Sequence, residues 1–227
     1  MKADAKAQFI VSETTLDTSE EEQAPVSALR CESASELYQD MSKLMVLTAL
    51  KPGPDESCDA FSRRLLNSET PEDAVTFTAF ALMPRAAIWW GYEAVRTHVA
   101  SLPNEDAELL HKIAKWTQNP YDVLRWEIMA RALYSDYRSS SVYLGLAAGW
   151  SGGRVAPNDT LPVPRWRSPQ AVGAAVLSAL RPSDTESRSD QIGRVLAIAA
   201  PMMQGGRAEV VTQPPINPDA THANTQA

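Results

Sequence analysis

One glycine-rich segment contains a serine at the position, relative to its glycines, that a catalytic nucleophile would occupy. Residues 149 to 153 read G-W-S-G-G, which matches the pattern G-x-S-x-G of serine hydrolases. That chemistry requires the serine on a sharp turn between a strand and a helix, with an acid and a histidine later in the chain. Here the run follows a predicted helix, and the only later histidine, His222, lies near the end of the chain. We therefore interpret the run as a glycine-rich end of a helix and predict no catalytic residue.

The sequence has no residues at the spacing that a metal site or a cofactor-binding loop requires. His98 and His111 fall on different predicted helices, Cys31 and Cys58 form no CxxC pair, and neither HExxH nor a glycine-rich phosphate loop occurs. We predict no metal and no cofactor.

The cysteines fit free thiols in a reducing compartment, the N-terminal residues lack a signal-peptide pattern, and no apolar run could span a bilayer. These features predict a cytoplasmic protein.

Aromatic and proline residues are the best remaining candidates for a functional surface. A proline-rich connection, residues 154 to 167, joins two predicted helices and is longer than most loops, which favours a functional role. We expect it to form a ledge that contacts a protein partner, although tryptophans on helices often simply fill the core. The candidate partner-contacting residues are Trp90, Trp150, Arg154, Pro162, Pro164, Trp166, and, in an apolar triplet near the N-terminus, Phe9 and Ile10.

The charge balance limits the class of partner. The chain has 21 Lys and Arg against 28 Asp and Glu, a formal net charge of -7. A surface that is acidic on average repels the phosphate backbone of a nucleic acid. A nucleic-acid binder would need one basic face that included Arg63, Arg64, Arg85 and Arg96. We therefore predict a protein partner and no nucleic acid.

The 227 residues are long enough for one domain with tails. Residues 11 to 24 contain five acids and no basic residue, so we predict a flexible acidic arm over residues 1–32. Residues 33–206 form the predicted helical domain. Residues 207–227 lack hydrophobic periodicity and are predicted to be a disordered tail.

Helix signals predict an all-α domain of about 8–9 antiparallel helices. Ser33 begins one helix that ends before Pro52. Three later helices are predicted to begin with a capping side chain followed by proline, at Thr70, Asn119 and Ser168, which are spaced 49 residues apart. Tandem helical hairpins of the HEAT kind have a period of this length, so stacked hairpins are one arrangement that the spacing allows.

The helix that begins at Pro84 carries a long apolar stripe. Its members follow at intervals of three and four residues: Ile88, Tyr92, Val95, Val99 and Leu102. Trp90 falls on the opposite face. The helix is therefore either central and packed on two sides, which the neighbouring small residues favour, or it displays Trp90 to a partner.

Three segments together carry a family resemblance: Pro84-Arg85 followed by Ile88-Trp89-Trp90, then Trp150 to Gly153 leading to Ala156-Pro157, then Pro162 to Pro164. Over residues 74–203 the chain resembles an uncharacterised family of small helical bacterial proteins found in gene neighbourhoods of type VI secretion systems. The resemblance implies a non-enzymatic, cytoplasmic adaptor or chaperone for a secretion spike or effector protein. The alternative is an enzyme of unknown class with Ser151, Arg154 and Asp159 at its site, in the loop from Gly149 to Asp159.

Overall fold

The computed structural model describes residues 28–99, 101–180 and 186–204. In these ranges the chain is all-α, as predicted, and its only strand-like pairings are two isolated bridges. The ten helices described are α1 (Ala34–Asp40), α2 (Leu44–Leu47), α3 (Cys58–Leu66), α4 (Glu72–Ala81), α5 (Pro84–His98), α6 (Asn104–Gln118), α7 (Asp122–Leu133), α8 (Ser140–Trp150), α9 (Arg167–Ala179) and α10 (Arg188–Met203).

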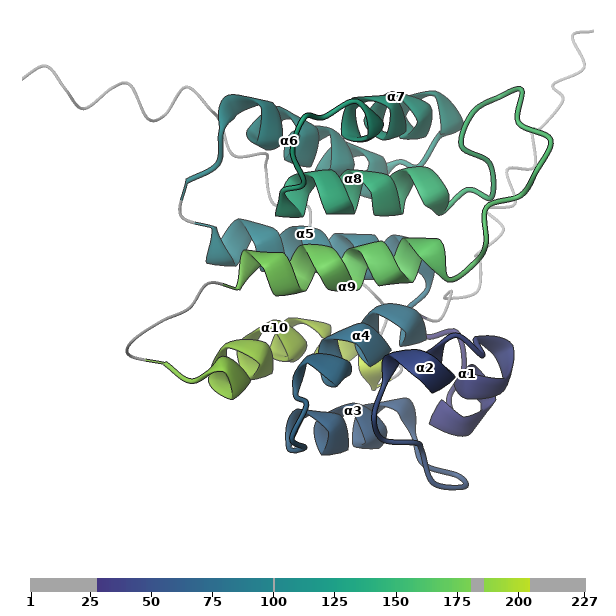
Figure 1. Cartoon of the computed structure of the whole chain (residues 1–227), viewed down its shortest axis with the longest axis vertical. Coiled ribbons are helices and arrows are strands. Elements are labelled where there is room, and N and C mark those ends of the chain that lie inside the picture. Colours follow the sequence, from purple (N-terminus) through teal and green to yellow (C-terminus); the bar gives the residue numbers. More distant parts are fainter. Residues whose placement is uncertain (1–27, 100, 181–185, 205–227) are drawn as a thin grey trace, which may run out of the picture.

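The helices pack in layers around one core (Figure 1). Helices α6, α7 and α8 form the upper layer, α5 and α9 cross the middle, and α1 to α4 lie below with α10. Both α4 and α5 pack directly against α9, although α9 comes far later in the sequence. In a stack of hairpins each unit contacts only its neighbours. The 49-residue spacing therefore does not produce a linear stack of hairpins in this chain.

The centre of the molecule is formed by helices that are buried on more than one side. In α8, every residue from Ser140 to Gly149 except Tyr143 is buried. In α5, Trp90 is fully buried and its indole N–H donates to the carbonyl oxygen of Val195 in α10, at 2.8 Å. The interpretation of α5 as a central helix is confirmed. The prediction of Trp90 as a partner contact is wrong, because α10 covers its face of α5.

Several helix boundaries differ from the sequence prediction. The helix expected to begin at Ser33 and to end before Pro52 is two helices, α1 and α2. Ser33 does cap α1, since its Oγ accepts from the Ser35 N–H at 3.2 Å. The three helices predicted to begin with caps at Thr70, Asn119 and Ser168 are α4, α7 and α9, and none of them has a side-chain cap. Ser168 lies inside α9 and donates instead to the carbonyl oxygen of Ala147, at 2.8 Å, which joins α9 to α8.

Residues 28–32 belong to the packed domain, whereas the acidic arm was predicted to continue to residue 32. Ala28 is buried, and its carbonyl oxygen accepts from the Met83 N–H at 2.7 Å. The Arg30 N–H donates to Ala81 at 2.9 Å, and the carbonyl of Glu32 accepts from Cys58 at 3.1 Å. Phe9, Ile10 and the predicted tail 207–227 lie outside the described residues.

Both cysteines are free thiols, and Cys58 is buried. The Cys58 Sγ donates to the carbonyl oxygen of Cys31 at 3.3 Å. Burial in apolar surroundings disfavours the thiolate and raises the pKa of Cys58 to about 12, above that of an ordinary thiol. Because the pKa is higher in the folded state, the Cys58 thiol contributes stability at pH values below the pKa of the unfolded thiol. That contribution is lost as the pH rises from the unfolded pKa toward 12.

Cys58 should therefore resist alkylation while the chain is folded. We expect iodoacetamide at pH 8.5 to leave Cys58 unmodified in the native protein and to modify it fully in guanidinium chloride, because only the exposed thiolate reacts. Peptide mass spectrometry of the two samples measures the difference. Rapid modification of Cys58 in the native sample would contradict its burial beneath the Cys31 backbone.

Candidate functional site

The connection between α8 and α9, residues 151–166, extends beyond the helices at one end of the molecule (Figure 1). We call it the ledge. The outgoing and returning parts of the ledge are joined by a hydrogen bond from the Val163 N–H to the Gly153 carbonyl, at 2.8 Å, and Val163 is buried. Near α9, Arg165 forms two hydrogen bonds with the Asp40 carboxylate, at 2.8 and 2.9 Å. The ledge is thus closed by an internal hydrogen bond and fixed to α1 at its α9 end.

Arg125 fixes the end of the ledge nearest α8. This α7 side chain is only 3% exposed, and its Nη1 donates to the carbonyl oxygens of Gly149 and Arg154, at 2.6 and 2.7 Å. Its Nε binds the exposed carboxylate of Asp122 at 3.0 Å. A cation near a helix C-terminus offsets the negative end of the helix dipole. Arg125 therefore both caps α8 and holds the first turn of the ledge.

Gly152 leaves the room that this arginine occupies. A Cβ added at residue 152 would lie 2.7 Å from Nη2 of Arg125, which is too close for any side chain without movement. The next residue, Gly153, has a φ of +76°, in the left-handed region that favours glycine. The glycine pair is thus required by a buried guanidinium and a tight turn.

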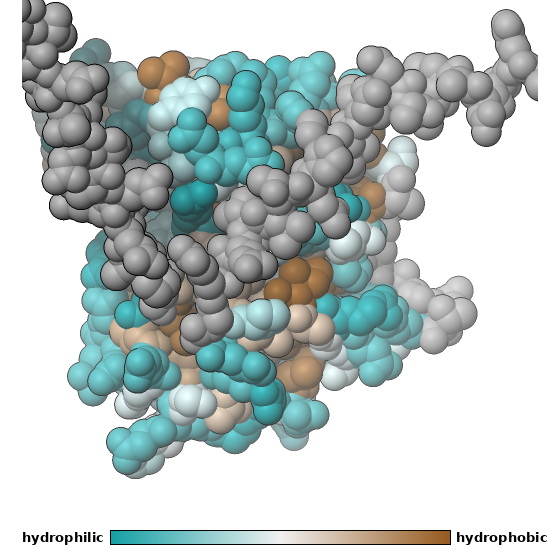
Figure 2. Space-filling view, turned by 180° about the vertical axis from the view of Figure 1, so that it is seen from behind, coloured by the Kyte–Doolittle hydropathy of each residue, from teal (hydrophilic) through white to brown (hydrophobic). Residues whose placement is uncertain are grey.

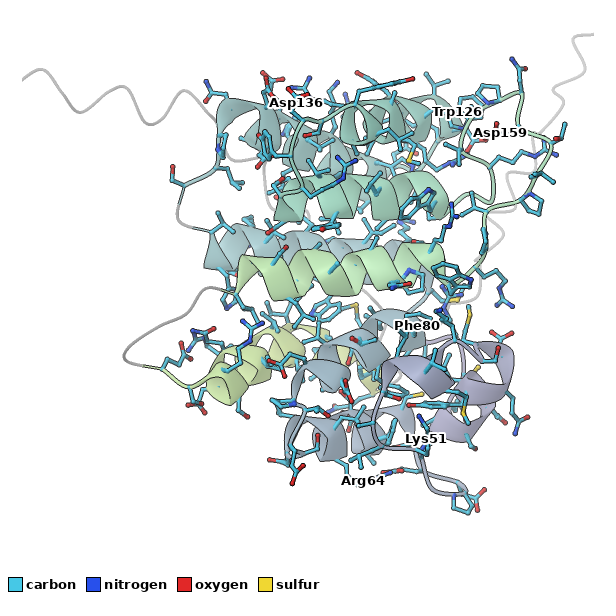
Figure 3. The ribbon with its side chains drawn as sticks, in the orientation of Figure 1. Lys51, Arg64, Phe80, Trp126, Asp136 and Asp159 are labelled. Carbon is cyan, nitrogen blue, oxygen red and sulfur yellow. The ribbon has the colours of Figure 1, made fainter. Side chains whose placement is uncertain are left out.

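A pocket of about 440 Å³ lies between α7 and the ledge. Figure 3 shows Trp126 of α7 and Asp159 of the ledge at this same end of the molecule. The pocket is lined by Asp122, Arg125, Trp126, Gly152, Gly153, Arg154 and Pro157. The buried Nε1 of Trp126 has no hydrogen-bond partner among the described residues. Of the charged groups in this lining, Arg125 is buried and bonded to Gly149, Arg154 and Asp122, whereas Arg154 is exposed.

The three residues named for an enzymatic alternative do not converge. The Ser151 Oγ donates to the carbonyl oxygen of Ala148 at 2.7 Å, within its own helix turn. The Asp159 carboxylate accepts from the Ala156 N–H at 3.0 Å and stabilises the turn of the ledge. Arg154 lines the pocket and is held through its carbonyl by Arg125. No group of His, Cys, Asp and Glu in the described ranges has the arrangement of a metal site.

A second pocket, of about 360 Å³, lies at the other end of the ledge. Trp166 lines it, and Lys43 Nζ lies 5.1 Å from the centroid of the Trp166 ring. Arg167 stacks between the two tryptophans that flank the ledge, with Cζ 5.6 Å from the Trp150 ring and 5.8 Å from the Trp166 ring. Both tryptophans are half-buried, so they anchor the ledge and also present part of their rings to solvent.

The structure places four of the predicted residues on the ledge, Arg154, Pro162, Pro164 and Trp166, and a fifth, Trp150, directly before it at the end of α8. The sequence reasoning missed Arg125, Lys43 and Leu161. Leu161, within the ledge, is 80% exposed. The sequence did contain a signal for Arg125, since it is a basic residue beside apolar positions of α7. A charged side chain in such a position is buried only where acceptors surround it, so it indicates a contact with another part of the chain. Nothing in the local sequence indicated that Lys43 would reach Trp166.

The fold and the ledge define a single all-α domain with a preformed, partly basic projection. The chain belongs to a family of unknown function, DUF6931, whose family model matches residues 61–203. Comparison with curated proteins and with solved structures gives no significant match. Within the part that the structure describes, no helix has both the length and the apolar character needed to cross a bilayer.

Proposed function

We propose that the protein is a non-enzymatic interaction module that binds a protein partner through the ledge. The observation that carries this proposal is an exposed apolar side chain, Leu161, on a loop that is anchored at both ends. An ordered loop loses little conformational entropy on binding, so an apolar side chain presented in this way contributes most of its burial energy to affinity.

Two further features support this proposal. Pro162 and Pro164 stiffen the chain next to Leu161 and are exposed to solvent. The surface seen from behind is mainly hydrophilic, with separate hydrophobic patches rather than one continuous apolar face (Figure 2). Such a surface suits reversible association with a partner better than a permanent assembly.

We further propose that the partner is a spike or effector protein of a type VI secretion system and that the chain acts in the cytoplasm as its adaptor or chaperone. This part of the proposal is supported by the resemblance of the segments at Pro84, Trp150 and Pro162. The end of α8 and the ledge together include two of these segments, from Trp150 to Pro157 and from Pro162 to Pro164.

An affinity pull-down from native cells tests both parts. We expect the tagged full chain to recover a spike or effector protein, and Leu161→Arg to lower its recovery by about tenfold or more, because a charge would be buried at the centre of the contact. Tyr134→Arg is the matched control, since Tyr134 is 86% exposed after α7 and outside the ledge. Equal recovery by the Leu161 variant and the wild type would contradict the ledge as the binding surface.

A further inference from the structure

A basic surface with exposed aromatic edges lies where the ledge meets α1 and α2. It consists of Lys43, Arg165, Arg167, Trp150 and Trp166, and we call it the cationic surface. Asp40 pairs with Arg165. Among the described residues, no carboxylate forms an ion pair with Lys43 or with Arg167. In a chain with net charge -7, this surface concentrates positive charge that the fold itself leaves partly uncompensated.

The first described residues lie beside this surface. Arg30 is fixed by a hydrogen bond from its Nε to the Leu82 carbonyl, at 3.1 Å. Burial lowers the pKa of Arg30, and the nearby positive charge of Arg165 lowers it further, with Asp40 acting in the opposite direction. Arg30 is therefore close enough to the Arg165 and Asp40 pair to feel both charges. The described part of the chain therefore begins close to this pair.

The preceding segment carries the opposite charge. Its acids are Glu13, Asp17, Glu20, Glu21 and Glu22, and residues 11–24 include no basic residue. Glu22 is six residues before Ala28. Because an extended chain spans about 3.4 Å per residue, a stretch of this length reaches roughly 20 Å. Any part of the cationic surface within this distance of Ala28 is therefore accessible to the three consecutive glutamates without rearrangement of the domain.

We propose that the acidic segment, residues 13–22, binds the cationic surface of its own chain. Carboxylates would pair with Lys43 and Arg167, the two cations that stack on the tryptophans. The bound segment would cover the α9 end of the ledge, so a partner that uses this end must displace it. The proposal concerns the chain alone and does not depend on the identity or existence of the partner proposed above.

Zero-length cross-linking of the full chain tests this contact. A carbodiimide joins a carboxylate to a lysine amine only when the two groups are in direct contact. We expect amide cross-links between Lys43 and Glu20, Glu21 or Glu22, at least about fivefold more abundant than those from Lys115 on the exposed side of α6, because steering raises the local concentration of carboxylates. In 0.5 M NaCl, where the screening length is only a few ångströms, the excess should disappear.

A charge-reversal pair gives the control. Arg167→Glu should reduce the Lys43 cross-links by about threefold or more, the size expected for an exposed ion pair converted to a repulsion. This change suits the first turn of α9, where an acid is favourable, so the fold should persist. Arg138→Glu alters the net charge equally, but at an exposed site between α7 and α8. Equal losses in the two variants, or equal yields from Lys43 and Lys115, would overturn the proposal.

Isotopic mixing distinguishes binding within one chain from binding between copies. Equal amounts of ¹⁴N and ¹⁵N protein at low concentration should give cross-linked peptides of unmixed isotopic composition. Mixed pairs as the main product would overturn the intramolecular contact and indicate exchange of the acidic segment between two molecules.

Discussion

Trp90→Ala should lower the free energy of unfolding by about 3–5 kcal/mol, the loss expected for a fully buried tryptophan replaced by alanine. The side chain has no exposed surface and donates to Val195 across the α5–α10 contact. Its removal leaves a cavity between these two helices and also breaks this hydrogen bond. Urea unfolding, followed by circular dichroism, would measure the change.

Trp90→Phe separates the two contributions. Phenylalanine retains much of the apolar volume but has no N–H, so we expect a smaller loss, with about 1 kcal/mol due to the hydrogen bond and the rest to reduced packing. Tyr134→Ala, at an exposed site, should change stability by less than about 0.5 kcal/mol. A Trp90→Ala protein as stable as the wild type would mean that the indole is not part of the core.

Arg125→Ala should cost about 2–4 kcal/mol and should also loosen the ledge. The change leaves the buried carbonyl of Gly149 and the part-buried carbonyl of Arg154 without their donor, and a buried carbonyl that loses its partner costs about 1–3 kcal/mol. Urea unfolding measures the cost. Hydrogen exchange measures the second effect, since the Val163 amide, bonded to Gly153, should exchange faster in the variant.

Two other variants test whether the carbonyl contacts or the ion pair matter more. Arg125→Lys retains the positive charge but cannot reach Asp122 and both carbonyls at once, so an intermediate loss is expected. Asp122→Asn affects only an exposed carboxylate and should cost less than about 1 kcal/mol. If Asp122→Asn destabilised the protein as much as Arg125→Ala, the ion pair rather than the capping of α8 would be the main contribution.

Local patterns predicted most helices but not where each one stops. Pro84 at the start of α5 was a correct signal, because proline suits the first turn. The apolar stripe continued to Val99 and Leu102, yet α5 ends at His98. Both residues still pack against the core as half-buried side chains. The helical spacing of these apolar residues therefore predicted their burial correctly. It did not predict where α5 ends, because that depends on the turn that leads into α6.

Helix α3 shows that a short helix can be missed although its signals are present. Ser57 caps it by accepting from the Ala60 N–H at 3.2 Å, Asp59 lies in its first turn, and Arg63 and Arg64 lie in its last. The helix has nine residues, and its apolar positions are few and interrupted by charges. Its burial comes from α4 and α10, which the local sequence does not specify.

The ledge could be predicted as a position in the sequence but not as a structure. Its prolines and flanking tryptophans indicated a long, ordered connection, and the chain does place Pro162, Pro164 and Trp166 there. The residues that hold it in place, Arg125 and Asp40, come from helices that are distant in sequence. Such contacts depend on how α1 and α7 are placed by the whole core, so no local pattern could reveal them.

The hydrogen bond between Trp90 and Val195 joins residues 105 positions apart. Because a ribosome makes the chain from its N-terminus, α4 and α5 emerge long before α10 exists to cover them. During that interval the newly made chain exposes the apolar surface that α10 later covers, and such surfaces promote aggregation and attract folding helpers. A message truncated before codon 195 would therefore yield a protein that cannot complete its core.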